Sequence, residues 1–94
     1  MTDLQTYCKR LKIPIRMLKS RSQKADIATA RQVWWYYLYE VGCHRTKYGY
    51  TMKAIGKMFN RHNTTVTHGI KRIKDLISLN DNYLKRFLEA INND

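Results

Sequence analysis

A run of short polar side chains followed by basic ones, at residues 61–72, is the part of this chain best equipped for specific chemistry. An asparagine amide can bond adenine N6 and N7 together, a threonine methyl can touch a thymine methyl, and lysine or arginine can neutralise phosphates. On helical spacing Val66 faces a core, and the residues left outside are Asn63, Thr64, Thr67 and His68, with Lys71 and Arg72 one turn on. These residues are the candidate contacts of a DNA-reading helix, whose N-terminal N–H groups would also suit a phosphate.

The same segment allows an interpretation that needs no ligand. Asn63 and Thr64 are also good N-cap residues, because their side-chain oxygens can accept hydrogen bonds from the first turn of a helix. Base recognition and plain capping therefore stay open as alternatives for these two residues.

The charge of the chain favours a polyanionic partner. Its 94 residues carry 18 Lys and Arg against 7 Asp and Glu, a net charge of +11, and the excess lies in the first 80 residues. A surplus of this size is typical of proteins that bind nucleic acid. A hydrophobic content of 44% with 12% aromatic residues argues against a disordered basic tail.

Several other classes are not expected. The longest uncharged stretch, Gln32–Tyr39, is too short to span a bilayer, so we expect no membrane partner. The N-terminus has no apolar segment typical of a signal peptide, so we expect a cytoplasmic location. In that compartment Cys8 and Cys43 stay reduced. No arrangement of the seven acidic residues, three histidines or two cysteines predicts a catalytic or metal site, and we expect no enzyme activity and no cofactor.

The spacing of the apolar residues predicts an all-α domain of five to six helices that occupies residues 1–94. We expect helices at about 3–11, at 14–18 as a short turn, and at 25–41, 51–59, 63–79 and 82–92, with loops at 19–24 and 43–50. Gly42 is the expected stop of the long helix. Two turns of helix, a break at residues 60–62 and a longer helix form a helix-turn-helix at about 52–79, whose second helix would enter the major groove.

Two further expectations concern apolar and aromatic side chains. In the second helix of the pair, Val66, Ile70, Ile73 and Ile77 should face inward. The run Trp34-Trp35-Tyr36-Tyr37 sits in mid-helix at core spacing, so we interpret it as core rather than as a platform for single-stranded bases. Tyr48 and Tyr50 are better candidates for such stacking.

A family resemblance rests on the run from Ile55 to His68 (IGKMFNRHNTTVTH). It resembles the signature Ile-Gly-x-x-Phe-Gly-Arg-Asp-His-Thr-Thr-Val-x-His of the C-terminal DNA-binding domain of DnaA, the bacterial chromosomal replication initiator family. Upstream, the loop Lys19–Lys24 (KSRSQK), the triplet Ala30-Arg31-Gln32, and Ile13-Pro14 with Leu18-Lys19-Ser20 are similar to the corresponding family segments. The resemblance covers about residues 3–79 and implies the same fold.

The resemblance implies roles for particular residues. Asn63 and Thr64 match positions that read bases in the major groove, Arg61 matches a phosphate-contacting arginine, and residues 19–24 match a basic loop that enters the minor groove. Gln23 occupies the key basic position of that loop, so the entering side chain would be Arg21 or Lys24. The expected base contacts are thus Asn63, Thr64, Thr67 and His62, and the expected backbone or minor-groove contacts are Arg61, His68, Lys71, Arg72, Lys19, Arg21 and Lys24.

The chain also departs from the family pattern. Asn60 replaces a glycine, His62 replaces an aspartate and Asn63 replaces a histidine. An aspartate accepts from cytosine, whereas a neutral histidine accepts through only one nitrogen, so the family's target sequence is not carried over. The stretch 43–50 is longer than the family's connection. No G-x-x-x-x-G-K-[ST] motif occurs, since Met58 follows Gly56-Lys57, and the ATPase domain of the family is not expected here.

Three function classes follow from these observations. The first is a stand-alone, sequence-specific binder of double-stranded DNA, of bacterial or phage origin and nucleoid-associated, with a part in replication initiation or its regulation. The second is an RNA or non-specific nucleic-acid binder that uses the same charge. The third is a protein-interaction module. The helix at 82–92 is expected to pack on the core, with a dimer surface as its alternative, so the chain would be a monomer or a weak dimer.

Overall fold

The computed structural model describes residues 3–45 and 50–92. Within these ranges the chain forms only helices and their connections, which confirms the all-α prediction. The elements are α1 (Leu4–Leu11), α2 (Ile15–Leu18), α3 (Ala25–Arg45), α4 (Met52–Met58), α5 (Asn63–Ser78), a 3₁₀ turn η1 (Asn82–Leu84) and α6 (Lys85–Asn92).

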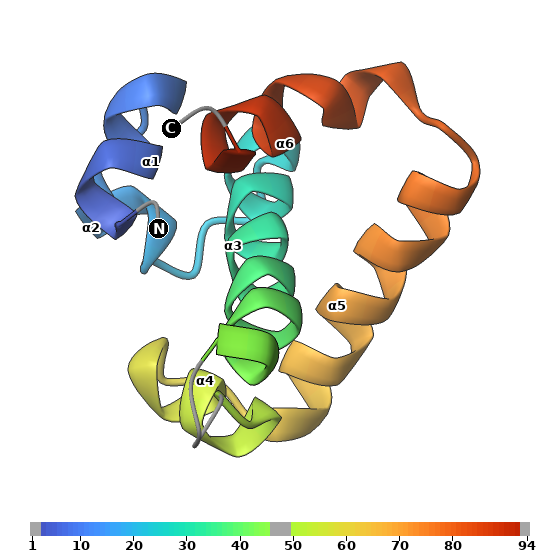
Figure 1. Ribbon diagram of the computed structural model, residues 1–94. Coiled ribbons are helices and arrows are strands. Elements are labelled where there is room, and N and C mark those ends of the chain that lie inside the picture. Colours follow the sequence, from blue (N-terminus) through green and yellow to red (C-terminus); the bar gives the residue numbers. More distant parts are fainter. Residues whose placement is uncertain (1–2, 46–49, 93–94) are drawn as a thin grey trace.

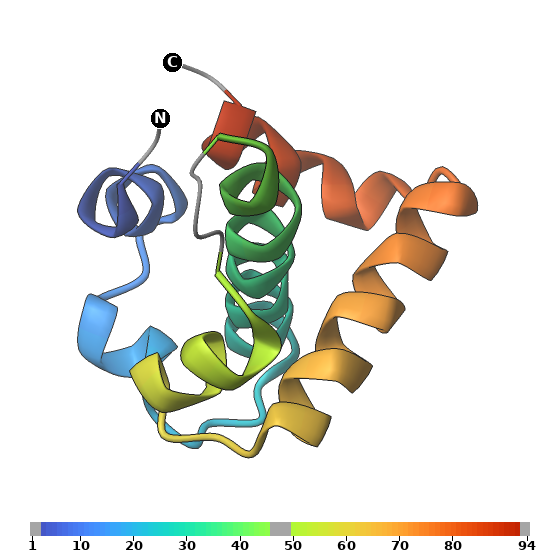
Figure 2. The same ribbon diagram turned by 60° about the horizontal axis from the view of Figure 1, so that its bottom comes forward.

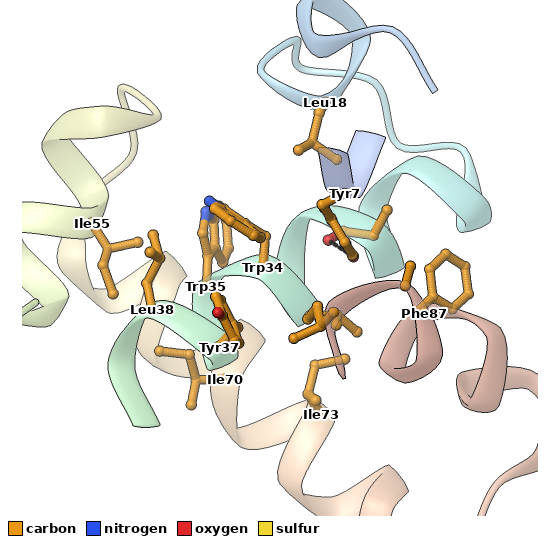
Figure 3. Close-up of a cluster of buried hydrophobic side chains, with 14 of the residues drawn as sticks. Tyr7, Leu18, Trp34, Trp35, Tyr37, Leu38, Ile55, Ile70, Ile73 and Phe87 are labelled. Atoms are coloured by element: carbon orange, nitrogen blue, oxygen red, sulfur yellow. Dashed lines mark hydrogen bonds between the residues drawn. The ribbon is translucent and has the colours of Figure 1, made fainter. Parts of the chain in front are cut away.

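Helix α3 is the central support of the fold. In Figure 1 it stands in the middle, with α1 and α2 on one side, α5 crossing on the other, and α4 and α6 near its two ends. Trp34, Trp35 and Tyr37 are each at most 5% exposed, which confirms that they are core, and Tyr36 is half-buried against them. Figure 3 shows this cluster between Leu18, Ile55 and Phe87, which come from α2, α4 and α6.

Aromatic contacts tie the other helices to α3. The ring of Tyr7 in α1 stacks on Trp34 at a centroid distance of 5.2 Å, and its hydroxyl donates to the Ala30 carbonyl oxygen at 2.7 Å. Phe59, directly after α4, meets Trp35 edge to face at 5.8 Å. A long helix that is apolar on more than one side is buried by several partners, which is the arrangement found here.

The end of α3 differs from the prediction. Gly42 was expected to stop the helix, but the helix continues to Arg45. A glycine inside a helix costs only about 1 kcal/mol relative to alanine, so it ends a helix only where the following chain turns away. The first three residues of the predicted loop 43–50 therefore belong to α3, and residues 46–49, which include Tyr48, lie outside the described residues.

The helix-turn-helix at 52–79 is present as predicted. Thr51 caps α4, because its hydroxyl oxygen accepts from the Ala54 amide at 3.1 Å. Helix α5 buries Val66, Ile70 and Ile73. Ile77 does not face inward as expected but is 37% exposed, because the last turn of α5 extends beyond the body of the domain.

The C-terminal helix packs on the core as expected. Asp81 caps the preceding 3₁₀ turn η1 by accepting from the Tyr83 amide at 2.8 Å, and Leu84, Phe87 and Ile91 are buried. Arg10 of α1 donates to the Ala90 carbonyl oxygen at 2.8 Å, which fastens α6 to α1. Within the described ranges, no helix has the length and apolar character that crossing a membrane would require.

The crossing of α5 over α3 depends on Gly69. A Cβ at this position would lie 2.9 Å from Cε3 and Cζ3 of Trp35 and 3.0 Å from Cγ of Gln32. The indole is buried in the core and has little room to move. The two helices therefore approach closely only because residue 69 has no side chain.

We expect Gly69→Ala to lower the free energy of unfolding by about 1–3 kcal/mol, because overpacking against Trp35 outweighs the gain in helix propensity. Chemical denaturation followed by circular dichroism measures this change. Ser78→Ala on the exposed end of the same helix is the control and should change stability by less than about 0.5 kcal/mol. Equal stability of Gly69→Ala and wild type would show that the indole can give way.

Candidate nucleic-acid interface

The turn between α4 and α5 is fixed by a close backbone contact. The Arg61 amide donates to the Gly56 carbonyl oxygen at 2.7 Å, and a Cβ on Gly56 would lie only 2.5 Å from the Arg61 carbonyl oxygen. Asn60 has φ 53°, in the left-handed region. Asparagine tolerates this region better than most residues, so the replacement of the family's glycine by Asn60 is compatible with the turn.

His62 is the N-cap of α5. Its Nδ1 accepts a hydrogen bond from the Thr64 amide at 3.1 Å, and its backbone is extended. The alternative in which Asn63 or Thr64 caps this helix is therefore wrong, because α5 already begins at Asn63, one residue earlier than a cap at Asn63 would require. Since Nδ1 accepts, the neutral ring carries its proton on Nε2.

Helix α5 presents a polar stripe to solvent. Thr64, Thr67, His68 and Lys71 recur at helical spacing and are all exposed, and Asp75 continues the stripe one turn further. The negative charge of Asp75 would repel a polyanion, so favourable contacts with DNA end before this residue. Asn63 is also exposed, beside the stripe at the start of the helix.

Two of the predicted contacts on α5 have partners inside the protein. The Thr67 hydroxyl oxygen lies 2.9 Å from the Asn63 carbonyl oxygen, to which it can donate. Arg72 Nη1 donates to Gln32 Oε1 at 2.6 Å, and it also lies 3.3 Å from Thr29 Oγ1. Arg72 thus leans on α3, on the side of α5 next to the stripe.

The basic loop at 19–24 is held by the buried side chain of Arg31, which is only 7% exposed. Its Nε donates to the Leu18 carbonyl oxygen at 2.7 Å, and its Nη2 donates to the carbonyl oxygens of Ser20 at 2.7 Å and Ser22 at 3.2 Å. Burial and the nearby charge of Arg61 lower the pKa of Arg31. An arginine remains protonated in spite of such a shift.

Arg61 joins the loop to the helix-turn-helix. Its Nη2 donates to the Ser20 carbonyl oxygen at 2.6 Å, and its Nη1 donates to the Phe59 carbonyl oxygen at 2.9 Å. Figure 2 shows the consequence, with the loop and the turn before α5 running side by side at the lower edge of the molecule. Ser20 therefore accepts from two guanidinium groups through one oxygen.

The loop directs its remaining cations outward. Arg21, Lys24 and Lys19 are all exposed, and Lys19 Nζ lies 6.0 Å from the centroid of the Phe59 ring. The serine hydroxyls shape the loop from inside, because the Ser22 amide donates to Ser20 Oγ at 3.1 Å and the Lys24 amide to Ser22 Oγ at 3.3 Å.

A hollow of about 260 Å³ lies between the loop and the first turn of α5. Three arginines and no acidic residue line it. The lining residues are Arg21, Ser22, Gln23, Ala28, Arg31, Gln32, Trp35, Arg61 and Thr65. An anion entering this space would meet positive charge from both the loop and the turn before α5.

Sequence reasoning did not single out Arg31, the Ser20 carbonyl, Gln32 or Thr65 as parts of this site. One signal was available. Arg31 falls at the apolar spacing of α3, four residues after Ile27 and four before Trp35. A charged residue at a core position needs partners for all its polar atoms, so it points to a network around it.

The placement of Tyr50 does not support a role in base stacking. Tyr50, a stacking candidate, is half-buried against the core. Among the residues that the structure describes, no three His, Cys, Asp or Glu side chains gather in a way that could hold a metal ion.

Comparison with known proteins identifies the family. The model of the bacterial DnaA protein helix-turn-helix matches residues 4–73. The chain belongs to this family. It is a family of DNA-binding helix-turn-helix domains, and the match spans both the basic loop and the helix-turn-helix.

Two curated relatives agree with this assignment. The chromosomal replication initiator protein DnaA of Mycoplasma pneumoniae is 31% identical over 78 residues, which are 83% of this chain and 16% of the relative. The protein of the same name from Mycoplasma genitalium is 28% identical over 88 residues, or 94% of this chain and 18% of the relative. The chain thus spans less than a fifth of the length of these relatives. No solved structure matches it.

We expect His62→Ala to remove the N-cap of α5 and to lower the free energy of unfolding by about 1 kcal/mol, a fall in Tm of about 4–8 °C. Thermal melts without DNA measure this change. His62→Asp should restore the cap, since aspartate is a preferred N-cap residue. Asn63→Ala is the matched control and should leave Tm within about 2 °C of wild type, because its side chain does not cap the helix. A larger loss for Asn63→Ala than for His62→Ala would contradict this assignment.

Proposed function

We propose that this domain binds double-stranded DNA with sequence preference, with α5 in the major groove and the 19–24 loop in the adjacent minor groove. The observation that carries the proposal is the position of the loop beside the start of α5, joined to it through Arg61 and Ser20. Two elements that lie side by side in this way would suit two neighbouring grooves of one duplex.

The hollow between these elements supports the same placement. Neighbouring major and minor grooves are separated by one sugar-phosphate backbone, so a strand must cross the space between the loop and α5. That space is lined by Arg21, Arg31 and Arg61 without any acid. Backbone phosphates are the anions that this charge would attract, and such contacts set the register of the protein on DNA.

The residues on α5 suit base recognition at its first two turns. Asn63 would bond an adenine edge, and the methyl groups of Thr64 and Thr67 would contact thymine methyls, since the Thr67 hydroxyl is used within the helix. His62 accepts through Nδ1, so its Nε2–H would donate to an acceptor such as guanine N7. The family's aspartate at this position can only accept, and we therefore expect a different target sequence.

Sequence-independent contacts would come from the surrounding cations. The exposed cations around the proposed path of the strands are His68, Lys71, Lys19, Arg21 and Lys24, and either Arg21 or Lys24 would enter the minor groove. Arg61 could contact a phosphate only through the N–H groups that do not already donate to carbonyl oxygens. Arg72 would first have to break its hydrogen bond to Gln32. We therefore rank these two arginines below the others as backbone contacts.

The names of the relatives support a proposal for the wider role. Both are named as chromosomal replication initiator proteins. We propose that the chain acts at DNA in replication initiation or its regulation, inside the cytoplasm and on the nucleoid, as a monomer or weak dimer. The proposed role requires no catalysis, metal or cofactor from these residues, which use hydrogen bonds and charge alone.

Selection from random duplex DNA, followed by binding titrations on the selected site and on a scrambled duplex, tests sequence preference. We expect Asn63→Ala to weaken binding to the selected site by about 1–3 kcal/mol and to change scrambled binding little. Asp75→Asn, one turn beyond the proposed contacts on the same stripe, is the control and should not reduce discrimination. If Asn63→Ala retains full discrimination, base reading by Asn63 is wrong.

Salt dependence tests the part that charge plays. If about five phosphates are neutralised, log K should fall with log salt concentration at a slope of about −4 to −5. Competition with structured RNA belongs to the same series, because an RNA binder would prefer the RNA at every salt concentration. A slope near zero would contradict the electrostatic part of the proposal and would favour the protein-interaction alternative.

A further inference from the structure

We propose that Arg31 is a positioning residue for DNA binding: with Arg61 it holds the 19–24 loop preformed at a fixed distance from α5. This inference rests on the proposed function and adds the residue that sets the spacing of the two DNA-contacting elements. The side chain of Arg31 is only 7% exposed, so it acts through the loop rather than as a contact of its own.

The hydrogen bonds of Arg31 follow the loop along its length. Its acceptors are the carbonyl oxygens of three alternate residues, Leu18, Ser20 and Ser22. A planar group with several fixed donors can serve these three oxygens at once, and lysine has neither the fork nor the planarity. The loop conformation is thus built around the guanidinium group.

Arg61 extends this constraint to the helix-turn-helix. It donates to Phe59 in the turn and to Ser20 in the loop. Arg61 therefore joins the two parts of the interface through the Ser20 carbonyl oxygen, which also accepts from Arg31. Movement of the loop away from α5 would break hydrogen bonds to both arginines.

A fixed spacing has a consequence for affinity and for site choice. A loop that is already ordered pays no ordering cost when it binds. The loop and α5 must also match a defined separation of base pairs, because one added base pair shifts the duplex by about 3.4 Å and about 35°. Loss of Arg31 should therefore weaken binding only when the loop is able to contact DNA.

The test is a double-mutant cycle on the duplex obtained by selection. One arm is Arg31→Lys, which keeps the charge. The other arm is the loop double variant Arg21→Ala with Lys24→Ala, which removes the candidate minor-groove contacts. We expect Arg31→Lys to weaken binding about tenfold in the wild-type loop and less than about twofold in the variant loop, since groups that act together are not additive. Arg16→Lys, an exposed arginine on α2, is the matched control and should change binding less than about twofold in both loops.

Amide hydrogen exchange of the free protein gives a readout without DNA. The amides of Ser22 and Lys24 donate to serine hydroxyls inside the loop. We expect both to exchange at least about tenfold faster in Arg31→Lys, while amides in the middle of α3 keep their wild-type protection. A general loss of protection would instead mean that the substitution destabilises the whole fold.

If Arg31→Lys does not fold, Ser22→Gly replaces it in the cycle, because it removes a loop hydroxyl and leaves Arg31 and Arg61 in place. Equal weakening by the chosen variant in both loop backgrounds would overturn the proposal and would assign Arg31 a direct contact or a purely structural role. Unchanged exchange at Ser22 and Lys24 in Arg31→Lys, or at Lys24 in Ser22→Gly, would also overturn it. If the wild-type protein selects no duplex, the proposed function is wrong. The exchange rates of the Ser22 and Lys24 amides would still show whether Arg31 keeps the loop preformed.

Discussion

The Ser20 carbonyl oxygen accepts from two guanidinium groups, one buried in the core and one at the turn before α5. Arg31 and Arg61 lie 30 residues apart in the sequence and repel each other, yet both converge on this atom. The cost of placing them together is offset by the carbonyl oxygens around them, each of which can accept more than one hydrogen bond. The position of the loop relative to α5 depends on this arrangement.

The core has the task of keeping that arrangement rigid. Helix α3 carries Arg31 and, within the next turn, the buried residues Trp34 and Trp35. These indoles contact α1, the end of α4 and α5. The same packing therefore fixes the position of the Arg31 side chain. Gly69 and Gly56 let helix and turn approach closely where any side chain would interfere. A small domain can therefore present two separate surface elements at a fixed spacing without a partner subunit.

Much of this could be predicted from the sequence. Apolar spacing placed the helices, and the pattern of a short helix, a break and a longer helix predicted the helix-turn-helix, which the resemblance over Ile55–His68 also implied. These features are local, so neighbouring residues determine them. The prediction that α3 ends at Gly42 was wrong, because a glycine costs a helix little free energy. The prediction that Ile77 is buried was wrong, because periodicity does not show where a helix extends beyond the core.

The parts that could not be predicted depend on contacts between distant segments. Capping of α5 by His62 was missed because histidine is not a typical N-cap residue, and propensity favoured Asn63. The internal partners of Arg61 and Arg72 were missed because exposed basic residues in a chain of net charge +11 were all taken as free for phosphate. Sequence reasoning identified which residues carry the charge, whereas the fold determines which of them are already engaged.

The most direct test of the central claim is an NMR study of the domain bound to its selected duplex. The account predicts intermolecular NOEs from the Thr64 methyl group to thymine methyl or cytosine H5 protons in the major groove. It also predicts NOEs from the Arg21 or Lys24 side chain to adenine H2 protons in the neighbouring minor groove. NOEs or large shift changes confined to α1 and α6, with α5 and the loop unperturbed, would contradict it.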